Sequence, residues 1–185
     1  MLYFVRHALD DERFVGSWSD VSILDSEIPL VKSRAQFIKE NLEVKRIVSS
    51  DIRRAMETAL IIAKEIGLEV EVDPNLREQN KGILTGRLRS SLMASERFLL
   101  EHQEIDTVFP CGESLLEVYQ RIKDYLEVLN TFEDGTLFVT HRGVINMIYY
   151  ILTETPLDME KSRFDVSHLS IHEWDILKRK IRRIK

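Results

Sequence analysis

The sequence has little cysteine and no long apolar run. Only one cysteine, Cys111, stands among 185 residues, so the chain can form no internal disulfide, which fits a reducing cytosol. No segment approaches the roughly 20 apolar residues that span a bilayer. The N-terminal run MLYFV is too short for the apolar region of a secretion signal. We therefore expect a cytoplasmic protein that has no membrane partner.

Positive charge is also scarce. Lys and Arg number 26 against 31 Asp and Glu, which gives a formal net charge of −5. Binding to a phosphate backbone usually needs an excess of positive charge, so we expect no nucleic-acid partner. Hydrophobic residues make up 44% of the chain, an ordinary share for a globular protein. Its length suits one domain, and we predict a single domain over residues 1–185.

Glycine and proline are few, with seven and four residues, so much of the chain should be regular structure. Helical spacing of apolar residues predicts helices over 28–42, 49–67, about 88–104, 114–129 and 142–152. Short apolar or alternating runs predict strands at 2–5, 46–49, 68–74, 136–139, 167–174 and 177–184. This alternation predicts an α/β fold, a three-layer sandwich with a mostly parallel central sheet flanked by helices.

Charged and polar residues follow several of these strands directly. Arg6 and His7 come after the first strand, and Ser49 and Ser50 end the second, just before the next helix. The third strand leads to residues 73–78, and the fourth to 140–141. Ligands of open α/β sheets bind beyond the carboxyl ends of the strands. We therefore expect these residues to meet at one edge of the sheet.

Five motifs in order carry a family resemblance. VRHA, SSDIRRAMETA, LREQNKG, PCGES and VTHRGVIN resemble the histidine phosphatase superfamily, also called the phosphoglycerate mutase-like family. The resemblance covers residue 2 to about residue 150 and implies the family's sandwich fold. By this match His7 is the nucleophile that takes the phosphoryl group, and Glu78 is the proton donor. Arg6, Arg54 and His141 complete the catalytic group as phosphate ligands.

These residue types suit phosphoryl transfer, which needs positioning and neutralisation of charge more than covalent chemistry. A guanidinium stays charged and can bond two phosphate oxygens. The imidazole of His7 must be neutral to attack, so nearby arginines that lower its pKa would help. Either Glu78 or the phosphate must carry the proton for a poor leaving group. The scheme requires no metal and no cofactor.

Several positions depart from the family pattern. Ala8 replaces the usual glycine after the nucleophile, and Thr85 replaces a usual glutamate. An acid-rich segment, DDER at 10–13, replaces the usual asparagine, and we predict that Arg13 takes over a phosphate contact. Arg142 stands where the family often has glycine or alanine, and we expect it at the pocket rim. With Arg87 and Arg89 as further rim cations, these residues predict a substrate that has a second anionic group.

Three other residue sets receive structural interpretations. His168 and His172 fall on one face of the strand predicted at 167–174, and no third ligand stands nearby in sequence, so we predict no metal site there. Cys111 has no cationic neighbour in sequence and is interpreted as incidental. Ser114 is interpreted as a helix cap.

The sequence thus predicts a phosphoric monoester hydrolase that acts on a small phosphate ester through phosphohistidine at His7. Phosphatase is preferred to mutase because the segment at 88–110 is short for a lid that keeps water from phosphohistidine. Two alternatives stay open: phosphotransfer of the phosphoglycerate mutase type, and a non-catalytic domain that binds phosphate or a protein. Oligomeric state and the physiological substrate stay open as well.

Overall fold

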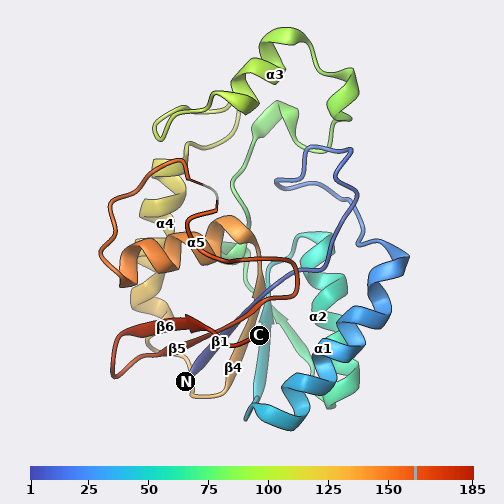
Figure 1. Cartoon of the computed structure of the whole chain (residues 1–185), viewed down its shortest axis with the longest axis vertical. Helices are drawn as coiled ribbons and strands as arrows, with labels where there is room; N and C mark the ends of the chain where they lie inside the picture. The colour runs from blue at the N-terminus through green and yellow to red at the C-terminus, as the bar shows by residue number, and fades with distance from the viewer. Residues whose placement is uncertain (161) are drawn as a thin grey trace.

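In the computed structural model, which describes residues 1–160 and 162–185, a mixed six-stranded sheet forms the centre of the molecule (Figure 1). Its strands lie in the order β3-β2-β4-β1-β5-β6. Their bounds are β1 Leu2–Arg6, β2 Arg46–Ser49, β3 Val70–Val72, β4 Thr136–Thr140, β5 Ile171–Asp175 and β6 Lys180–Arg183. The first four are mutually parallel, whereas β5 runs antiparallel to β1 and β6 antiparallel to β5.

Helices cover both faces of this sheet (Figure 1). The described helices are α1 Ile28–Asn41, α2 Arg53–Ile66, α3 Ala94–Glu101, α4 Leu115–Leu129 and α5 Arg142–Leu152. Single 3-10 turns occupy Asp25–Glu27, Pro74–Leu76, Gly82–Leu84 and Arg89–Ser91. None of the described helices is long and apolar enough to cross a membrane.

The central strand β1 divides the core into two layers. Leu2 and Phe4 pack with α4 and α5, whereas Tyr3 and Val5 pack with α1 and α2. This follows from the period of a strand, because successive side chains point to opposite faces. A strand that is buried on both faces must be apolar throughout, as the run at 2–5 is. The predicted α/β sandwich with a mostly parallel sheet is therefore confirmed.

The strand predicted at 167–174 begins later than expected. Residues 167–170 form a loop, and Leu169 has a φ of 58°, in the left-handed region that side chains rarely adopt. The loop is held to the end of β1, because Leu169 N–H donates to Arg6 O at 3.1 Å and Arg6 N–H to Ser170 O at 3.3 Å. His168 therefore lies beside the end of β1, and the prediction that it shares a strand face with His172 is wrong.

The N-termini of α2 and α4 are capped differently. The N-cap residue of α2 is Ile52, which makes no side-chain capping bond. Asp51 instead pairs with Arg77. The predicted cap of α4 is confirmed, since Ser114 Oγ accepts from Glu117 N–H at 3.1 Å and Glu117 Oε2 accepts from Ser114 N–H at 2.7 Å.

Helix α3 is shorter than the predicted 88–104. Its first part is replaced by the 3-10 turn Arg89–Ser91, and the helix begins only at Ala94. Arg89 N–H donates to Arg13 O at 2.8 Å and Val15 N–H to Arg87 O at 2.8 Å. These bonds hold Leu88 extended beside Phe14, so the helix cannot begin at residue 88.

Two loops cross in close contact near Gly82. Ile83 N–H donates to Pro110 O at 3.1 Å, and Glu113 N–H donates to Asn80 O at 2.9 Å. Gly82 has a φ of 53°, and a Cβ there would lie 1.8 Å from Pro110 O. Only glycine permits this approach. The crossing fixes the segment that follows Glu78.

We predict that Gly82→Ala destabilises the protein more than Gly67→Ala. Both glycines have positive φ, but a Cβ at Gly67 would meet nothing within 4 Å. Gly67→Ala should therefore cost only the left-handed strain, about 1–2 kcal/mol. Gly82→Ala should cost a further 1–3 kcal/mol, roughly, for the forced backbone shift. Urea unfolding of both variants measures the difference, and equal losses would contradict the crossing.

Candidate active site

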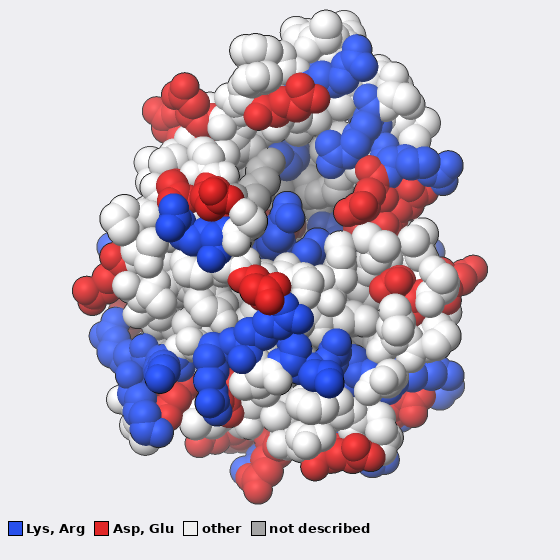
Figure 2. All heavy atoms as spheres, viewed as in Figure 1, with Lys and Arg blue, Asp and Glu red and all other residues white. Residues whose placement is uncertain are grey.

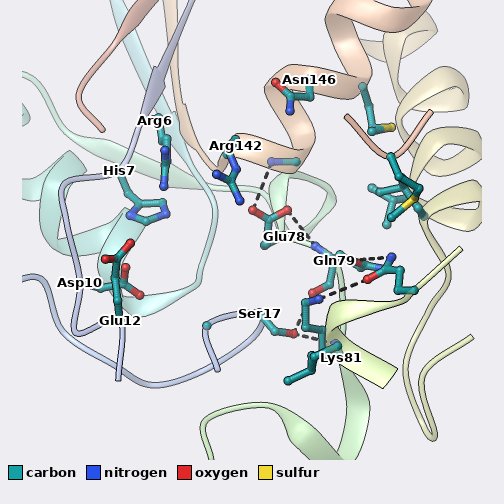
Figure 3. A pocket seen from close by; sticks show the side chains of 18 of the residues that line it. Arg6, His7, Asp10, Glu12, Ser17, Glu78, Gln79, Lys81, Arg142 and Asn146 are labelled. Atoms are coloured by element: carbon teal, nitrogen blue, oxygen red, sulfur yellow. Dashed lines mark hydrogen bonds between the residues drawn. The ribbon is translucent and has the colours of Figure 1, made fainter. Parts of the chain in front are cut away.

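A pocket of about 520 Å³ opens at the carboxyl ends of β1 and β4. Figure 2 shows Lys and Arg side chains gathered around the hollow in the upper half of that face. Figure 3 shows many of the residues that line it. Five predicted site residues come together there from distant parts of the chain: Arg6, His7, Arg54, Glu78 and Arg142. Two residues that were not predicted, Asp10 and His168, line the same pocket.

The imidazole of His7 is fixed in one orientation. Its backbone N–H donates to Thr140 O at 2.9 Å, which continues the pairing of β1 with β4. Its Nδ1 lies 2.7 Å from Ala8 O. A carbonyl only accepts, so Nδ1 carries the proton and Nε2 carries the free electron pair. Arg54 Nε donates to this Nε2 at 3.1 Å. The nitrogen that could attack therefore faces the nearest guanidinium.

Both burial and nearby charge keep His7 neutral. Its pKa is held well below the usual value, first by burial and then by the guanidinium charges of Arg54 and Arg6. The side chain is 4% exposed. A neutral imidazole is the form that can act as a nucleophile.

Arg54 enters the site from the first turn of α2 and is almost completely buried. Its Nη2 donates to Ser17 O at 2.8 Å, and its Nε lies 3.6 Å from Asp10 Oδ2. Burial lowers the pKa of Arg54, and the charges of Asp10 and Glu78 oppose that effect. The guanidinium thus stays a cation beside His7.

Arg6 ends β1 and reaches the pocket from the other side. Its Nη1 donates to Val166 O at 2.8 Å, and its Nη2 lies 2.6 Å from His168 Nε2. Burial, followed by the charge of Arg142, lowers the pKa of Arg6 to about 10, so it remains charged at neutral pH. Two guanidinium groups therefore approach His7 from separate elements.

Glu78 places its carboxylate at the N-terminus of α5. Gly143 N–H donates to Oε2 at 3.2 Å and Gln79 N–H donates to Oε1 at 3.0 Å (Figure 3). A Cβ at Gly143 would lie 2.1 Å from Glu78 Oε1. The backbone leading to Glu78 is tied to β4 by Thr140 Oγ1, which donates to Leu76 O at 2.7 Å. The missing side chain at Gly143 therefore makes room for the acid.

His141 lies beside His7 and is not among the residues that line the pocket. The two ring centroids are 5.1 Å apart, and His141 Nε2 lies 2.9 Å from Ser50 Oγ. Its Nδ1 is buried and has no hydrogen-bond partner among the residues that the structure describes. Burial and the charges of Arg54 and Arg6 hold its pKa well below the usual value. His141 is therefore neutral here, with one ring nitrogen unused.

His168 is one of the two site residues that sequence reasoning missed. It lines the pocket from the loop before β5, with its ring centroid 5.5 Å from that of His7. Burial and the charges of Arg6 and Arg142 lower its pKa to about 4, so it accepts the bond from Arg6 as a neutral ring. No sequence motif marks it, because its position depends on the left-handed residue that follows.

The predicted rim residues divide into two groups. Arg142 lines the pocket, as does Arg89. Arg13 is not among the lining residues: it is exposed, and its Nη2 pairs with Asp11 Oδ2 at 2.5 Å. Arg87 pairs with Glu96 at 2.5 Å. The structure therefore does not bring Arg13 to the phosphate ligands.

Two residues that depart from the family pattern, Ala8 and Thr85, have structural roles. Ala8 is buried in the core against α1 and α2 and lies outside the left-handed region. Thr85 Oγ1 donates to Ser17 Oγ at 2.9 Å. Ser17 Oγ in turn donates to Gln79 O at 2.7 Å. Thr85 thus supports the loop that holds Arg54 and the residue next to Glu78.

One group in the described part of the chain has the spacing of metal ligands. Ligand atoms of His7, Asp10 and His168 lie within 4.8 Å of one another. Arg54 and Arg6 contact the same three side chains, at 3.1 Å from His7, 3.6 Å from Asp10 and 2.6 Å from His168. Two fixed positive charges oppose a divalent cation and favour an anion. The arrangement can hold a phosphoryl group against a neutral nucleophile.

Comparisons with known proteins agree with this geometry. The chain is 33% identical over 185 residues to the probable phosphoglycerate mutase GpmB of Escherichia fergusonii, covering 94% of this chain and 84% of that protein. It is 31% identical over 167 residues to a candidate phosphoserine phosphatase of Hydrogenobacter thermophilus, covering 85% and 80%. The structure of Bacillus stearothermophilus YhfR superposes with a TM-score of 0.80 at 24% identity, covering 99% and 94%.

A family model extends the likeness over nearly the whole chain. The model of the histidine phosphatase superfamily, branch 1, matches residues 2–185, which includes the loop that carries His168. The chain belongs to the histidine phosphatase superfamily.

Proposed function

We propose that the protein is a metal-independent phosphomonoesterase that hydrolyses a small phosphate ester through a phosphohistidine on His7. The observation that carries the proposal is the fixed tautomer of His7. Its Nδ1 lies 2.7 Å from Ala8 O, so Nε2 carries the electron pair, which accepts a hydrogen bond from Arg54 until a phosphoryl group replaces that bond. The similar proteins named as phosphatase and mutase support the reaction class.

The first step transfers the phosphoryl group to the enzyme. The Nε2 electron pair of His7 forms the N–P bond while the ester P–O bond breaks. The departing alkoxide takes a proton from Glu78 or from the phosphate itself. The guanidinium groups of Arg6 and Arg54 neutralise the equatorial oxygens, and the bond from Nδ1–H to Ala8 O stabilises the imidazolium that forms.

The second step returns the enzyme to its starting state. A water molecule attacks phosphorus, and its proton passes to the Glu78 carboxylate. The N–P bond breaks, the electron pair returns to Nε2, and inorganic phosphate leaves. Arg142 lines the same pocket and adds a third positive charge for the phosphate.

A mutase remains the second candidate because the relative in Escherichia fergusonii carries that name. The observation that favours hydrolysis is the cover over the pocket. It contains one eight-residue helix, α3, whose last turn contributes Leu100 to the lining. Phosphate release without a bisphosphorylated activator indicates a phosphatase, and stimulation by a bisphosphorylated sugar acid with little phosphate release indicates a mutase. Tight ester binding without any turnover indicates a non-catalytic domain.

We predict that hydrolysis of p-nitrophenyl phosphate survives EDTA and requires His7. His7→Ala should lower kcat on the order of 10³-fold or more, because the nucleophile is lost. Phosphate release measured with EDTA present tests both statements. His102→Ala is the matched control, since His102 is exposed at the end of α3. Full activity of His7→Ala, or complete loss of wild-type activity in EDTA, would contradict the proposal.

We predict that Gly143→Ala impairs the proton donor selectively. The added Cβ would occupy the position of Glu78 Oε1, so the carboxyl group must move. For an alkyl phosphate, kcat should fall on the order of 10²-fold, because general acid catalysis is lost. For p-nitrophenyl phosphate, whose leaving group needs no proton, it should fall far less. The control is Gly16→Ala, where a Cβ meets Arg54 only at 3.8 Å. Equal losses on both esters would show that Glu78 is not the acid.

We predict that Arg54→Gln shifts the acid limb of the pH profile. The positive charge of Arg54 helps to lower the pKa of His7, so its removal should raise that pKa. Activity requires the neutral ring, and the acid limb of kcat/KM should therefore move to higher pH. The ionisation of the substrate phosphate is common to both proteins and cancels in the comparison.

The control for this shift is Arg53→Gln. Arg53 is the exposed neighbour of Arg54 and pairs with Glu57 at 2.8 Å. Its loss should leave the limb in place. An acid limb at the same pH in Arg54→Gln and wild type would mean that another group controls it.

A further inference from the structure

The pocket is larger than a phosphate group requires. Its volume of about 520 Å³ falls within the range of about 300–1,000 Å³ that holds whole small-molecule ligands. The phosphate ligands described above occupy the end near β1. The remaining space must therefore hold the organic part of the substrate, and its lining defines what that part is.

Helix α5 connects the two ends of the pocket. Arg142, Asn146 and Tyr150 are spaced four residues apart, so they lie on one face of the helix, and all three line the pocket. Each step of four residues advances about 6 Å along the axis. Asn146 therefore follows Arg142 one turn further from the N-terminus of α5, and Figure 3 shows both on this helix.

The wall around Asn146 is mainly apolar. Six apolar or aromatic side chains line this part of the pocket: Leu100, Leu115, Val118, Met147, Tyr150 and Met159. Leu115 and Val118 come from α4, which packs against α5. Such a wall favours an apolar body, because burying it removes apolar surface from water.

The other uncharged polar groups of this wall already have partners. Tyr150 donates its hydroxyl to Asp158 at 2.6 Å. Gln103 Nε2 donates to Gln79 Oε1 at 3.4 Å, and Gln103 Oε1 accepts from Lys81 at 3.4 Å. These bonds fix the side chains of the wall without any ligand.

Asn146 is the exception. It is 7% exposed, and its Oδ1 is buried without a hydrogen-bond partner among the described residues. A buried polar atom without a partner costs free energy, and such atoms are uncommon in folded proteins. Because this oxygen has almost no accessible surface, the amide must turn toward the pocket before a ligand group that donates a hydrogen bond can satisfy it.

Charge at this end disfavours a second anion. Asp158 and Glu160 both line the pocket, and Asp158 already pairs with Arg163. Lys81 lies on the side of the pocket opposite Asn146 (Figure 3). An anionic group at this end of the pocket would meet the carboxylate of Glu160, whereas a neutral group would not be repelled by it. This differs from the second anionic group that the rim arginines predicted.

We infer that Asn146 is a specificity-determining residue, and that it selects phosphate esters whose organic part is neutral, largely apolar and carries a hydroxyl or N–H donor. The inference rests on the proposed function, because it assigns the phosphate to the His7 end. The donor of the substrate binds Asn146 Oδ1, and the apolar body packs against α4 and α5.

The test uses a matched set of aryl phosphates: phenyl phosphate with hydroxymethyl, methoxymethyl or carboxylate at position 3 or 4. Binding is measured by calorimetry to His7→Ala, which holds the ester without transfer to His7. In either the 3-substituted or the 4-substituted series, the hydroxymethyl ester should bind roughly fivefold more tightly than the methoxymethyl ester, which is the effect of one hydrogen bond. The carboxylate should bind most weakly.

The same measurement on a second background isolates Asn146. In the double variant His7→Ala with Asn146→Leu, the hydroxymethyl and methoxymethyl esters should bind with about equal affinity. With Asn146→Asp, which keeps an acceptor oxygen, the preference should remain. Equal binding of the two esters to His7→Ala in both series would overturn the inference. So would a preference that survives Asn146→Leu, or tightest binding of the carboxylate.

Hydrolysis by the unmodified protein separates this inference from the proposed function. Release of phosphate from unsubstituted phenyl phosphate reports on His7 alone. A protein that releases no phosphate but shows the Asn146-dependent preference would refute the phosphatase and support the subsite. A protein that hydrolyses phenyl phosphate without that preference would support the phosphatase and refute the subsite.

Discussion

The structure depends on keeping a buried cation beside a histidine that must stay neutral. Arg54 is 2% exposed, and an unpaired charge at that depth would cost several kcal/mol, roughly. The protein offsets this cost with Ser17 O and with Asp10, which both belong to the loop after β1. That loop is in turn held by Thr85 and by the segment at 86–89. The loop after β1 and residues 85–89 together thus hold the partners of the Arg54 guanidinium in place.

Parts of the fold and site were readable from sequence because they depend on local pattern. The apolar run at 2–5 predicts a strand buried on both faces, and its charged end predicts where the pocket opens. Ser114 and Glu117 show the start of α4 through a reciprocal cap. The meeting of Arg6, His7, Arg54 and Glu78 followed from the order of parallel strands and from the family motifs.

Other parts depend on contacts that no local pattern encodes. His168 reaches the pocket because the backbone turns at Leu169, and nothing in the letters around it distinguishes that loop from the start of a strand. Arg13 was predicted at the phosphate, yet it pairs with Asp11 two residues away, a contact available to any exposed arginine. The unpaired oxygen of Asn146 becomes visible only when the partners of all neighbouring groups are known.

The place of β1 in the sheet bears on how the protein is made. Its neighbours are β4 and β5, which begin at Thr136 and Ile171, whereas His7 follows β1 immediately. During synthesis the chain emerges N-terminus first, so β1 has no partner strand until β4 has been made. His7 is therefore synthesised well before most of the residues that surround it. A nascent chain that stalls before β4 carries an apolar strand without a sheet, which is a natural target for a chaperone.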